Sequence, residues 1–392
     1  MTRAKLLQEI RGMKFHDVYL RWQEGRLSQE EGAEILGVDV RTMRRWMRRY
    51  EDDGMDGLID HRIGVISPRR APVDQVMKVQ DLYRHRYAGF TAKHFHEKLQ
   101  EEHRVPRSYT WTKQVLQQAG LVAKAKRRGA HRKRRERRPL TGMMLHQDGS
   151  RFEWVPGHQW DLIVTMDDAD NAIYSAFFVE EEGTMSSFLG IQAVVQKHGL
   201  FSSLYVDRGS HYFHTPKAGG KVDPQHRTQF HRAMDQLGIE LIAAYSPQAR
   251  GRSERLFKTL QDRLPKELAL AGVSTMAAAN RFLLRTYLPA HNRRFRVIPA
   301  APDTAFVPFI GQGLADILSV QESRTVANDN TVRYGSRILQ IPQDTHRCHY
   351  VKATVRVHEY PDAHLAVFHG PRCLARYDAR GRILKVKTKV AA

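Results

Sequence analysis

The chain has 392 residues and a net charge of +21, from 63 Lys and Arg against 42 Asp and Glu. Its 41% of hydrophobic residues excludes a largely disordered protein, and no apolar stretch reaches the roughly 18 residues of a membrane span. The N-terminus lacks the apolar segment of a signal peptide, and Cys348 and Cys373 are not spaced as zinc-finger ligands. We therefore expect a cytoplasmic protein with reduced cysteines.

The charge is unevenly distributed along the chain. Residues 1–140 hold 32 basic and 18 acidic residues, whereas residues 141–200 hold 2 basic and 9 acidic residues. A basic surface displaces counterions from a polyphosphate, which is the part of DNA binding that does not depend on sequence. The acidic segment would repel DNA unless cations bridge the two. The contrast between the two segments indicates either a metal site or acidic side chains that merely solvate an exposed face.

Residues 1–60 have the pattern of a helix-turn-helix domain. Ser28 and Glu31 form a capping box at the start of one helix, and a turn at Gly37 precedes an arginine-rich helix over residues 39–50. An ordinary three-helix bundle with a solvated basic face is the alternative. On the arginine-rich helix we predict DNA contacts for Arg41, Arg44, Arg45 and Arg48.

A second small helical unit, winged or helix-turn-helix-like, is predicted over residues 73–123. At its last helix, Arg107 and Lys113 are predicted to contact DNA. A basic linker follows over residues 124–140, with ten Lys or Arg among residues 124–138. Blocks of like charge repel one another until an anionic partner arrives, so this linker either contacts DNA or only aids solubility. Its predicted DNA contacts are Arg127, Arg128, Arg134 and Arg135.

Strands and helices alternate over residues 141–310. Short spacings between the first three strands predict an antiparallel meander, and the order three strands, helix, strand, helix, strand, helix is similar to the ribonuclease H-like α/β fold. Residues 325–390 hold short β-rich runs between turns and predict a small β-barrel. The predicted core strands are 143–152, 159–166, 172–179, 204–206 and 240–244, and the helices are 184–198, 228–237 and 252–268.

Three carboxylates in this region end or begin predicted elements. Asp148 and Asp207 each lie at the end of an apolar strand, and Glu254 lies at the start of a helix. Mg²⁺ prefers oxygen ligands, and two such ions can activate an oxygen nucleophile and neutralise charge at a phosphate. The pattern predicts a two-metal site for phosphoryl transfer on DNA, with Asp148 bridging both ions.

Three motifs carry a family resemblance. They are His146-Gln-Asp-Gly-Ser-x-x-x-Trp154, Val206-Asp-Arg-Gly-Ser-His211 and Tyr245-Ser-Pro-x-Ala-Arg-Gly-Arg-Ser-Glu-Arg255. Together they resemble the DDE transposase and retroviral integrase superfamily, and the whole chain resembles bacterial insertion-sequence transposases of the ISNCY type. The resemblance implies Asp148, Asp207 and Glu254 as catalytic triad and metal ligands.

The same resemblance implies cofactors and partners. They are two Mg²⁺ or Mn²⁺ ions and double-stranded DNA, as terminal inverted repeats and as target. Because two DNA ends must be brought together, at least a dimer is expected on DNA. The protein would then be associated with the bacterial nucleoid when it is bound to DNA.

The chain departs from the family pattern after Asp207. The 46 residues between Asp207 and Glu254 are more than is usual, and the surplus is read as an inserted loop around residues 214–224. Near Glu254, Arg250, Arg252 and Lys258 are predicted to contact DNA. Arg252 could instead keep Glu254 ionised, and Lys258 could instead pair with it one helical turn away. His211 lies either near a DNA phosphate or in a structural position.

Other acidic residues have simpler interpretations. Asp167, Asp168 and Asp170 fit a turn between strands, where such residues accept local backbone hydrogen bonds. Glu180–Glu182 precede a helix and favour its N-terminus electrostatically. Two functional alternatives also stay open: a transposase-derived DNA-binding regulator without catalysis, and a site-specific nuclease without strand transfer.

Overall fold

The computed structural model describes residues 3–63, 70–124, 136–216, 220–223, 225–245, 251–311, 313–343 and 346–384. The chain divides into two compact units, residues 1–85 and 86–392. The division falls inside the predicted 73–123 helical unit, and the predicted domain boundaries remain predictions. No helix in the described part of the chain has the length and apolar character to cross a membrane.

The first unit is helical. Ser28 caps α2 in the predicted capping box, and its Oγ accepts from the backbone of Glu31. Phe15, Val18 and Met43 lie in the small core, while the predicted arginines of α3 point to solvent. The elements are α1 (Arg3–Gln23), α2 (Gln29–Leu36), α3 (Val40–Asp53), the 3-10 turn η1 (Gly54–Leu58) and α4 (Val73–His85).

The second unit begins with α5 (Ala92–Glu101) and α6 (Tyr109–Gln118), which Thr91 and Ser108 cap. Charged side chains join α5 to helices of the core. Glu97 of α5 is buried and pairs with Arg263 at 2.6 Å and with Arg294 at 2.9 Å. Because both partners lie on core helices, α5 is fixed to the core by a largely buried ionic network.

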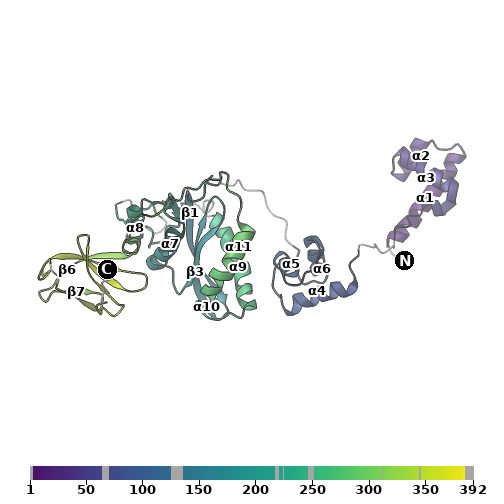
Figure 1. The fold of residues 1–392 in the computed structure, drawn as a ribbon. Coiled ribbons are helices and arrows are strands. Elements are labelled where there is room, and N and C mark those ends of the chain that lie inside the picture. Colours follow the sequence, from purple (N-terminus) through teal and green to yellow (C-terminus); the bar gives the residue numbers. More distant parts are fainter. Residues whose placement is uncertain are drawn as a thin grey trace. The chain divides into compact units, whose positions relative to one another are not determined.

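The core is a five-stranded mixed sheet in the order β3-β2-β1-β4-β5, seen edge-on among its helices in Figure 1. The first three strands are antiparallel, and β4 and β5 run parallel to β1. This confirms the predicted meander and element order. The strands are β1 (Met144–Val155), β2 (His158–Asp167), β3 (Ile173–Val179), β4 (Ser203–Val206) and β5 (Glu240–Ala243).

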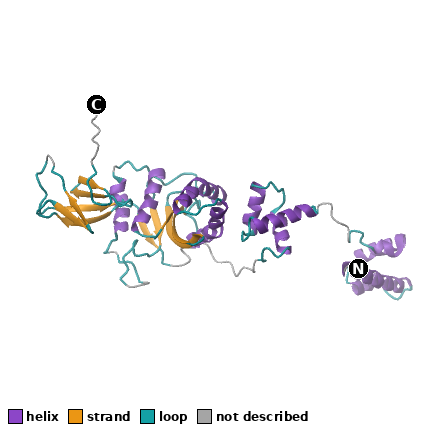
Figure 2. Cartoon of the chain, turned by 90° about the horizontal axis from the view of Figure 1, so that it is seen from below, coloured by secondary structure: helices purple, strands orange, loops and turns teal. Residues whose placement is uncertain are grey.

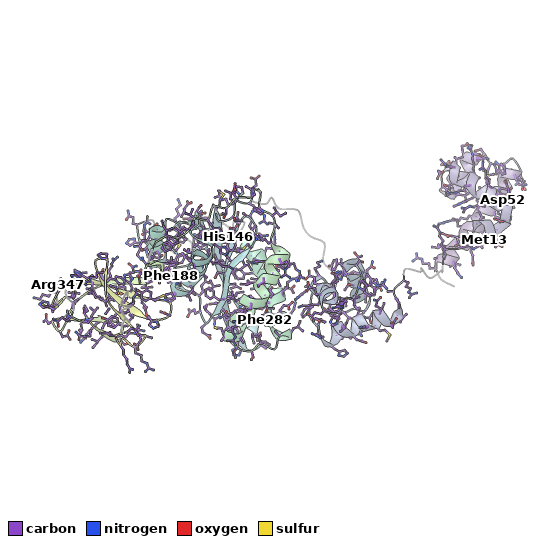
Figure 3. All side chains as sticks on the ribbon, viewed as in Figure 1. Met13, Asp52, His146, Phe188, Phe282 and Arg347 are labelled. Atoms are coloured by element: carbon purple, nitrogen blue, oxygen red, sulfur yellow. The ribbon has the colours of Figure 1, made fainter. Side chains whose placement is uncertain are left out.

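Helices cover both faces of this sheet (Figures 1 and 2). Trp154 and Leu162 pack against Leu260 on one face, and Leu145 and Leu204 pack against Phe188 on the other. Figure 3 labels Phe188 and Phe282 on these opposite sides. The first face carries α9 (Gly251–Leu270), α10 (Met276–Phe282), the π-helical turn η2 (Leu283–Tyr287) and α11 (Leu288–Phe295), and the second carries α7 (Thr184–His198) and α8 (Gln229–Leu237).

The predicted C-terminal barrel is not confirmed. Within the described residues, the strands form an open four-stranded sheet, β11-β10-β9-β6, and a separate hairpin, β7-β8. Val332 and Leu339 of the hairpin share a core with Val355 and Leu365 of the sheet, so the two pieces pack together without closing. The elements are α12 (Leu314–Ile317), β6 (Val320–Thr325), β7 (Thr331–Tyr334), β8 (Arg337–Gln340), β9 (Thr354–Glu359), β10 (Leu365–His369) and β11 (Arg372–Tyr377).

A buried histidine of α11 predicts acid sensitivity. Neither ring nitrogen of His291 has a hydrogen-bond partner, and burial, with the charges of Arg263 and Arg294, lowers its pKa to about 4. The pKa of a histidine in the unfolded chain is about 6.5, so the folded state binds a proton at His291 less readily than the unfolded state does. The folded state therefore has its full stability above about pH 6.5 and loses stability as the pH falls toward 4.

We expect the His291→Leu variant to lose less unfolding free energy than the wild type between about pH 6.5 and 4, by up to roughly 3 kcal/mol. Denaturant titrations across that range measure the difference. His158→Leu, at an exposed position on β2, is the matched control and should follow the wild type. If the unfolding free energies of wild type and His291→Leu changed equally with pH, His291 would not titrate in this range.

Candidate active site

The pairing of β1 with β4 brings Asp148 and Asp207 to neighbouring strands. In the parallel register, Leu145 lies beside Leu204 and His146 beside Tyr205. Continued two residues further, this register places Asp148 beside Asp207, although 58 residues separate them in sequence. Both residues are half-buried, and Asp207 Oδ1 accepts a 2.8 Å hydrogen bond from the backbone of Gly209.

Strand alternation places both aspartates on the α9 face of the sheet. His146, Asp148 and Ser150 share one face of β1, and the neighbouring Phe152 and Trp154 continue it into the core beneath α9. Tyr205, beside His146 with ring centroids 5.2 Å apart, shares that face with Asp207. Leu145 and Leu204 point the opposite way, toward α7.

On either side of Glu254, α9 is tied to β1 or to a residue that contacts β1. Arg252 donates to Asp168, which also contacts His146 of β1 at 2.8 Å. Further along α9, Gln261 Nε2 donates to Ser150 Oγ at 2.9 Å. Asp148 lies between the two β1 positions, and Glu254, exposed on the first turn of α9, lies between the two α9 positions.

Asp168 was predicted to be a turn residue, but in the structure it also binds side chains outside the turn. Asp167 and Asp170 do accept backbone hydrogen bonds within the turn, from Ala169 and Ala172. Asp168 is fully buried. Burial alone would raise its pKa, but hydrogen bonds from His146 and Arg252 outweigh that and hold the pKa well below its usual range. The resulting ion cluster fixes the first turn of α9.

Glu182 is a further carboxylate close to β1, on the α7 face of the sheet, and the sequence predicted only that it favours the N-terminus of α7. Its Oε1 lies 3.6 Å from His211 Nε2. A Cβ on Gly149 would come within 2.1 Å of its carboxylate, so the glycine after Asp148 makes room for Glu182. Burial, followed by the charges of Glu182, Asp148 and Asp207, raises the pKa of Tyr212.

His211 therefore faces a carboxylate of the protein, and burial lowers its pKa. This favours the structural position over the position near a DNA phosphate. The signal that could have identified Glu182 is the glycine immediately after Asp148, because a side chain is missing where another group must approach.

The predicted DNA contacts lie in different surroundings. Arg41, Arg44, Arg45 and Arg48 are exposed on α3, and Arg44 donates to Gln29 at 2.6 Å. Arg107 stacks over the Trp111 ring at 5.6 Å, and Lys113 is half-buried on α6. The others, Arg127, Arg128, Arg134, Arg135 and Arg250, lie outside the described residues.

Two predicted contacts flank Glu254 on α9. Lys258 is exposed one turn after it, and no ion pair joins these two described residues. Arg252 is largely buried against Asp168, so in this structure it serves the anchoring of α9.

Comparisons with known proteins agree with this architecture. A family model described as a helix-turn-helix domain matches residues 18–70, which contain α2 and α3. The chain is 31% identical over 348 residues to the protein named "Putative transposase y4bF" from Sinorhizobium fredii, covering 88% of this chain and 76% of that protein. It is 32% identical over 161 residues to the transposase for insertion sequence IS1202 from Streptococcus pneumoniae, covering 41% of this chain and 34% of that protein.

A helix-turn-helix domain joined to a mixed α/β core with carboxylates at one sheet edge is the architecture of a DNA-transposing protein. The extent of the match to the Sinorhizobium protein makes the assignment definite: the chain belongs to the transposase family.

Solved structures are more distant. A simian T-cell lymphotropic virus intasome in complex with PP2A regulatory subunit B56 gamma aligns at TM-score 0.35 and 14% identity, over 72% of this chain and 93% of that one. The HTLV-2 integrase catalytic core domain in complex with magnesium aligns at TM-score 0.30 and 15% identity, over 38% of this chain and 85% of that one. These likenesses are too distant to assign any residue.

The ion cluster around Asp168 predicts a stability effect that distinguishes two neighbouring arginines. Arg252→Ala leaves the buried Asp168 carboxylate without its guanidinium, so we expect a loss of roughly 3 kcal/mol in unfolding free energy. Arg255→Ala, at an exposed position on the same helical turn, should stay within about 0.5 kcal/mol of the wild type. Chemical denaturation measures both. Equal stabilities, with DNA affinity lost in Arg252→Ala, would instead identify Arg252 as a surface contact to DNA.

Proposed function

We propose that this transposase cleaves the ends of its element and joins them to target DNA by metal-dependent phosphoryl transfer, with Asp148, Asp207 and Glu254 as the catalytic carboxylates. The observation that supports it best is the β1–β4 register, which continued by two residues sets Asp148 and Asp207 on neighbouring strands. The three carboxylates come from three separate elements: β1, the residue after β4, and α9.

The donor set fits Mg²⁺ or Mn²⁺. All three side chains offer carboxylate oxygens, which hard divalent cations prefer, and few protein carboxylates are needed because water and phosphate oxygens complete the shell. Two bound ions would activate the attacking oxygen and stabilise charge on the leaving oxygen. In this proposal Asp148, Asp207 and Glu254 would hold the two ions.

The protein's own residues hold this arrangement in place. The sheet fixes Asp148 and Asp207, while Arg252 and Gln261 fix the helix that carries Glu254. Glu182, beside Gly149, orients His211 and adds negative charge that favours cation binding. Lys258, exposed one turn after Glu254, is placed to contact a phosphate of the DNA.

DNA recognition is assigned to the helical domains. The arginines of α3 form an exposed basic face on the helix that follows the turn, the position from which such domains read a major groove. The α5–α6 pair, with Arg107 and Lys113, and the basic linker over residues 124–140 add contacts to the DNA backbone. Bringing two DNA ends together requires at least two copies of the chain, so we propose an oligomer on DNA.

Neutralising one aspartate tests the triad. Asp207→Asn keeps the shape of the side chain but removes a metal-binding charge, so strand transfer should fall by at least about a hundredfold while DNA binding is retained. Asp148→Asn and Glu254→Gln should behave alike. Asp303→Asn, at an exposed position, is the control and should keep wild-type activity. The assay follows joining of labelled terminal-repeat DNA to a target with Mg²⁺ or Mn²⁺.

The same assay separates the alternatives. Full joining by Asp207→Asn would contradict the triad assignment. Wild-type protein that binds terminal repeats but cleaves nothing with either metal would indicate a DNA-binding regulator. Cleavage without joined products would indicate a nuclease.

The basic face of α3 predicts an effect on affinity that is separate from catalysis. Arg48→Ala should weaken DNA binding and lower the dependence of log affinity on log salt by about one unit if Arg48 contacts one phosphate. Arg21→Ala removes an exposed arginine of α1 that pairs with Asp17, and should leave the salt slope unchanged. Fluorescence anisotropy with duplex DNA at several salt concentrations measures both. Equal slopes for Arg48→Ala and wild type would rule out this contact.

A further inference from the structure

The segment that follows Asp207 closes on itself before α8 begins. Tyr212 and Phe213 are buried in the core, and Thr228, which caps α8, donates from its Oγ1 to the Tyr212 carbonyl at 2.9 Å. Residues 214–227 lie between these two fixed points, with residues 217–219 and 224 outside the described part. The predicted insertion is therefore a surface loop whose two ends are held side by side.

Three potential metal ligands gather where the ends of this loop meet. His214, Asp223 and His226 each offer a ligand atom, and these atoms lie within 4.8 Å of one another. Asp223 donates from its backbone to the His214 carbonyl at 2.9 Å, which holds the first ligand against the other two. The two imidazole rings lie 5.3 Å apart between centroids. In the described part of the chain, no other group of His, Cys, Asp or Glu meets this geometry.

We propose that His214, Asp223 and His226 form a transition-metal site, with Zn²⁺ as its natural ion, separate from the catalytic carboxylates. Two imidazole nitrogens and one carboxylate oxygen, with water in the fourth position, are a common tetrahedral zinc set. The triad offers oxygens alone and suits Mg²⁺, whereas imidazole favours Zn²⁺ and its neighbours in the transition series. The chain therefore holds two kinds of metal site that differ in ligand chemistry.

The ligands are prepared for this ion. His226 Nδ1 and Asp223 Oδ2 are 2.7 Å apart, and Asp223 Oδ1 accepts from the backbone of Gln225 at 2.8 Å. These contacts hold the Asp223 carboxylate beside the His226 ring. His214 and His226 are exposed, which leaves a path for the ion to enter.

Binding at this site would act on the neighbourhood of Asp207. Arg208, the next residue, donates to the Gly220 carbonyl of the loop at 2.6 Å and lies over the Tyr245 ring at 5.3 Å. A metal that joins His214 to Asp223 and His226 fixes both ends of the loop and so fixes the segment that Arg208 holds. A bound metal would therefore hold the two ends of the loop together. This does not depend on a catalytic role for Asp207.

The test measures zinc in the full-length chain without an affinity tag. Equilibrium dialysis against Zn²⁺ followed by elemental analysis should give one equivalent bound in wild type and in Asp207→Asn, the variant that disables the triad. His214→Ala and His226→Ala should each weaken Zn²⁺ binding at least about tenfold. His158→Ala, at an exposed histidine of β2, should bind as the wild type does.

A second measurement distinguishes loss of the metal site from misfolding of the variant. Zn²⁺ should slow tryptic cleavage after Lys221, an exposed residue of the loop, in wild type and not in His214→Ala, with circular dichroism confirming that both are folded. Equal Zn²⁺ binding by wild type and His214→Ala would overturn the proposal and leave Asp223 and His226 as a simple hydrogen-bonded pair. Loss of the zinc in Asp207→Asn, with His214→Ala unaffected, would also overturn it, because the ion would then belong to the triad.

Discussion

The parallel pairing of β1 with β4 is the constraint on which the rest of this molecule depends. It sets His146 beside Tyr205 and so carries Asp148 and Asp207 to one edge of the sheet, on the face covered by α9. A shift of one residue would turn one aspartate toward α7, because side chains alternate across a strand. The buried pair Leu145 and Leu204, packed against Phe188 on the opposite face, fixes the register that prevents this.

The helix that carries Glu254 is positioned by polar contacts as well as by its apolar face. Leu256, Phe257 and Leu260 bury one side of α9, but apolar packing alone leaves rotation and sliding weakly defined. Arg252 on Asp168 and Gln261 on Ser150 are directional contacts to β1 and its neighbour. The other end of α9 packs against α5. There Arg263 forms an ion pair with Glu97, and Glu267 contacts His94 and Lys98. One helix thus joins the part of the sheet near Asp148 to the α5–α6 unit.

Acidic residues crowd this part of the core, and they differ in burial. Asp168 is neutralised by Arg252, and Asp167 accepts backbone hydrogen bonds from Gly142 and Ala169. Burial nevertheless raises the pKa of Asp167 to about 6. Asp148, Asp207 and Glu254 are more exposed than these.

Local sequence by itself determined several elements of this protein: the capping box at Ser28, the span of α7 and the meander of β1 to β3. These follow from short-range periodicity and capping, which neighbouring residues decide. Tertiary structure alone decided the partners across long separations. It showed that Asp168 binds Arg252, that Glu182 lies against Gly149 and His211, and that β6 joins an open sheet where a barrel was predicted. Such contacts depend on which elements pack together, and local sequence does not specify the partner, even where a glycine such as Gly149 leaves room for one.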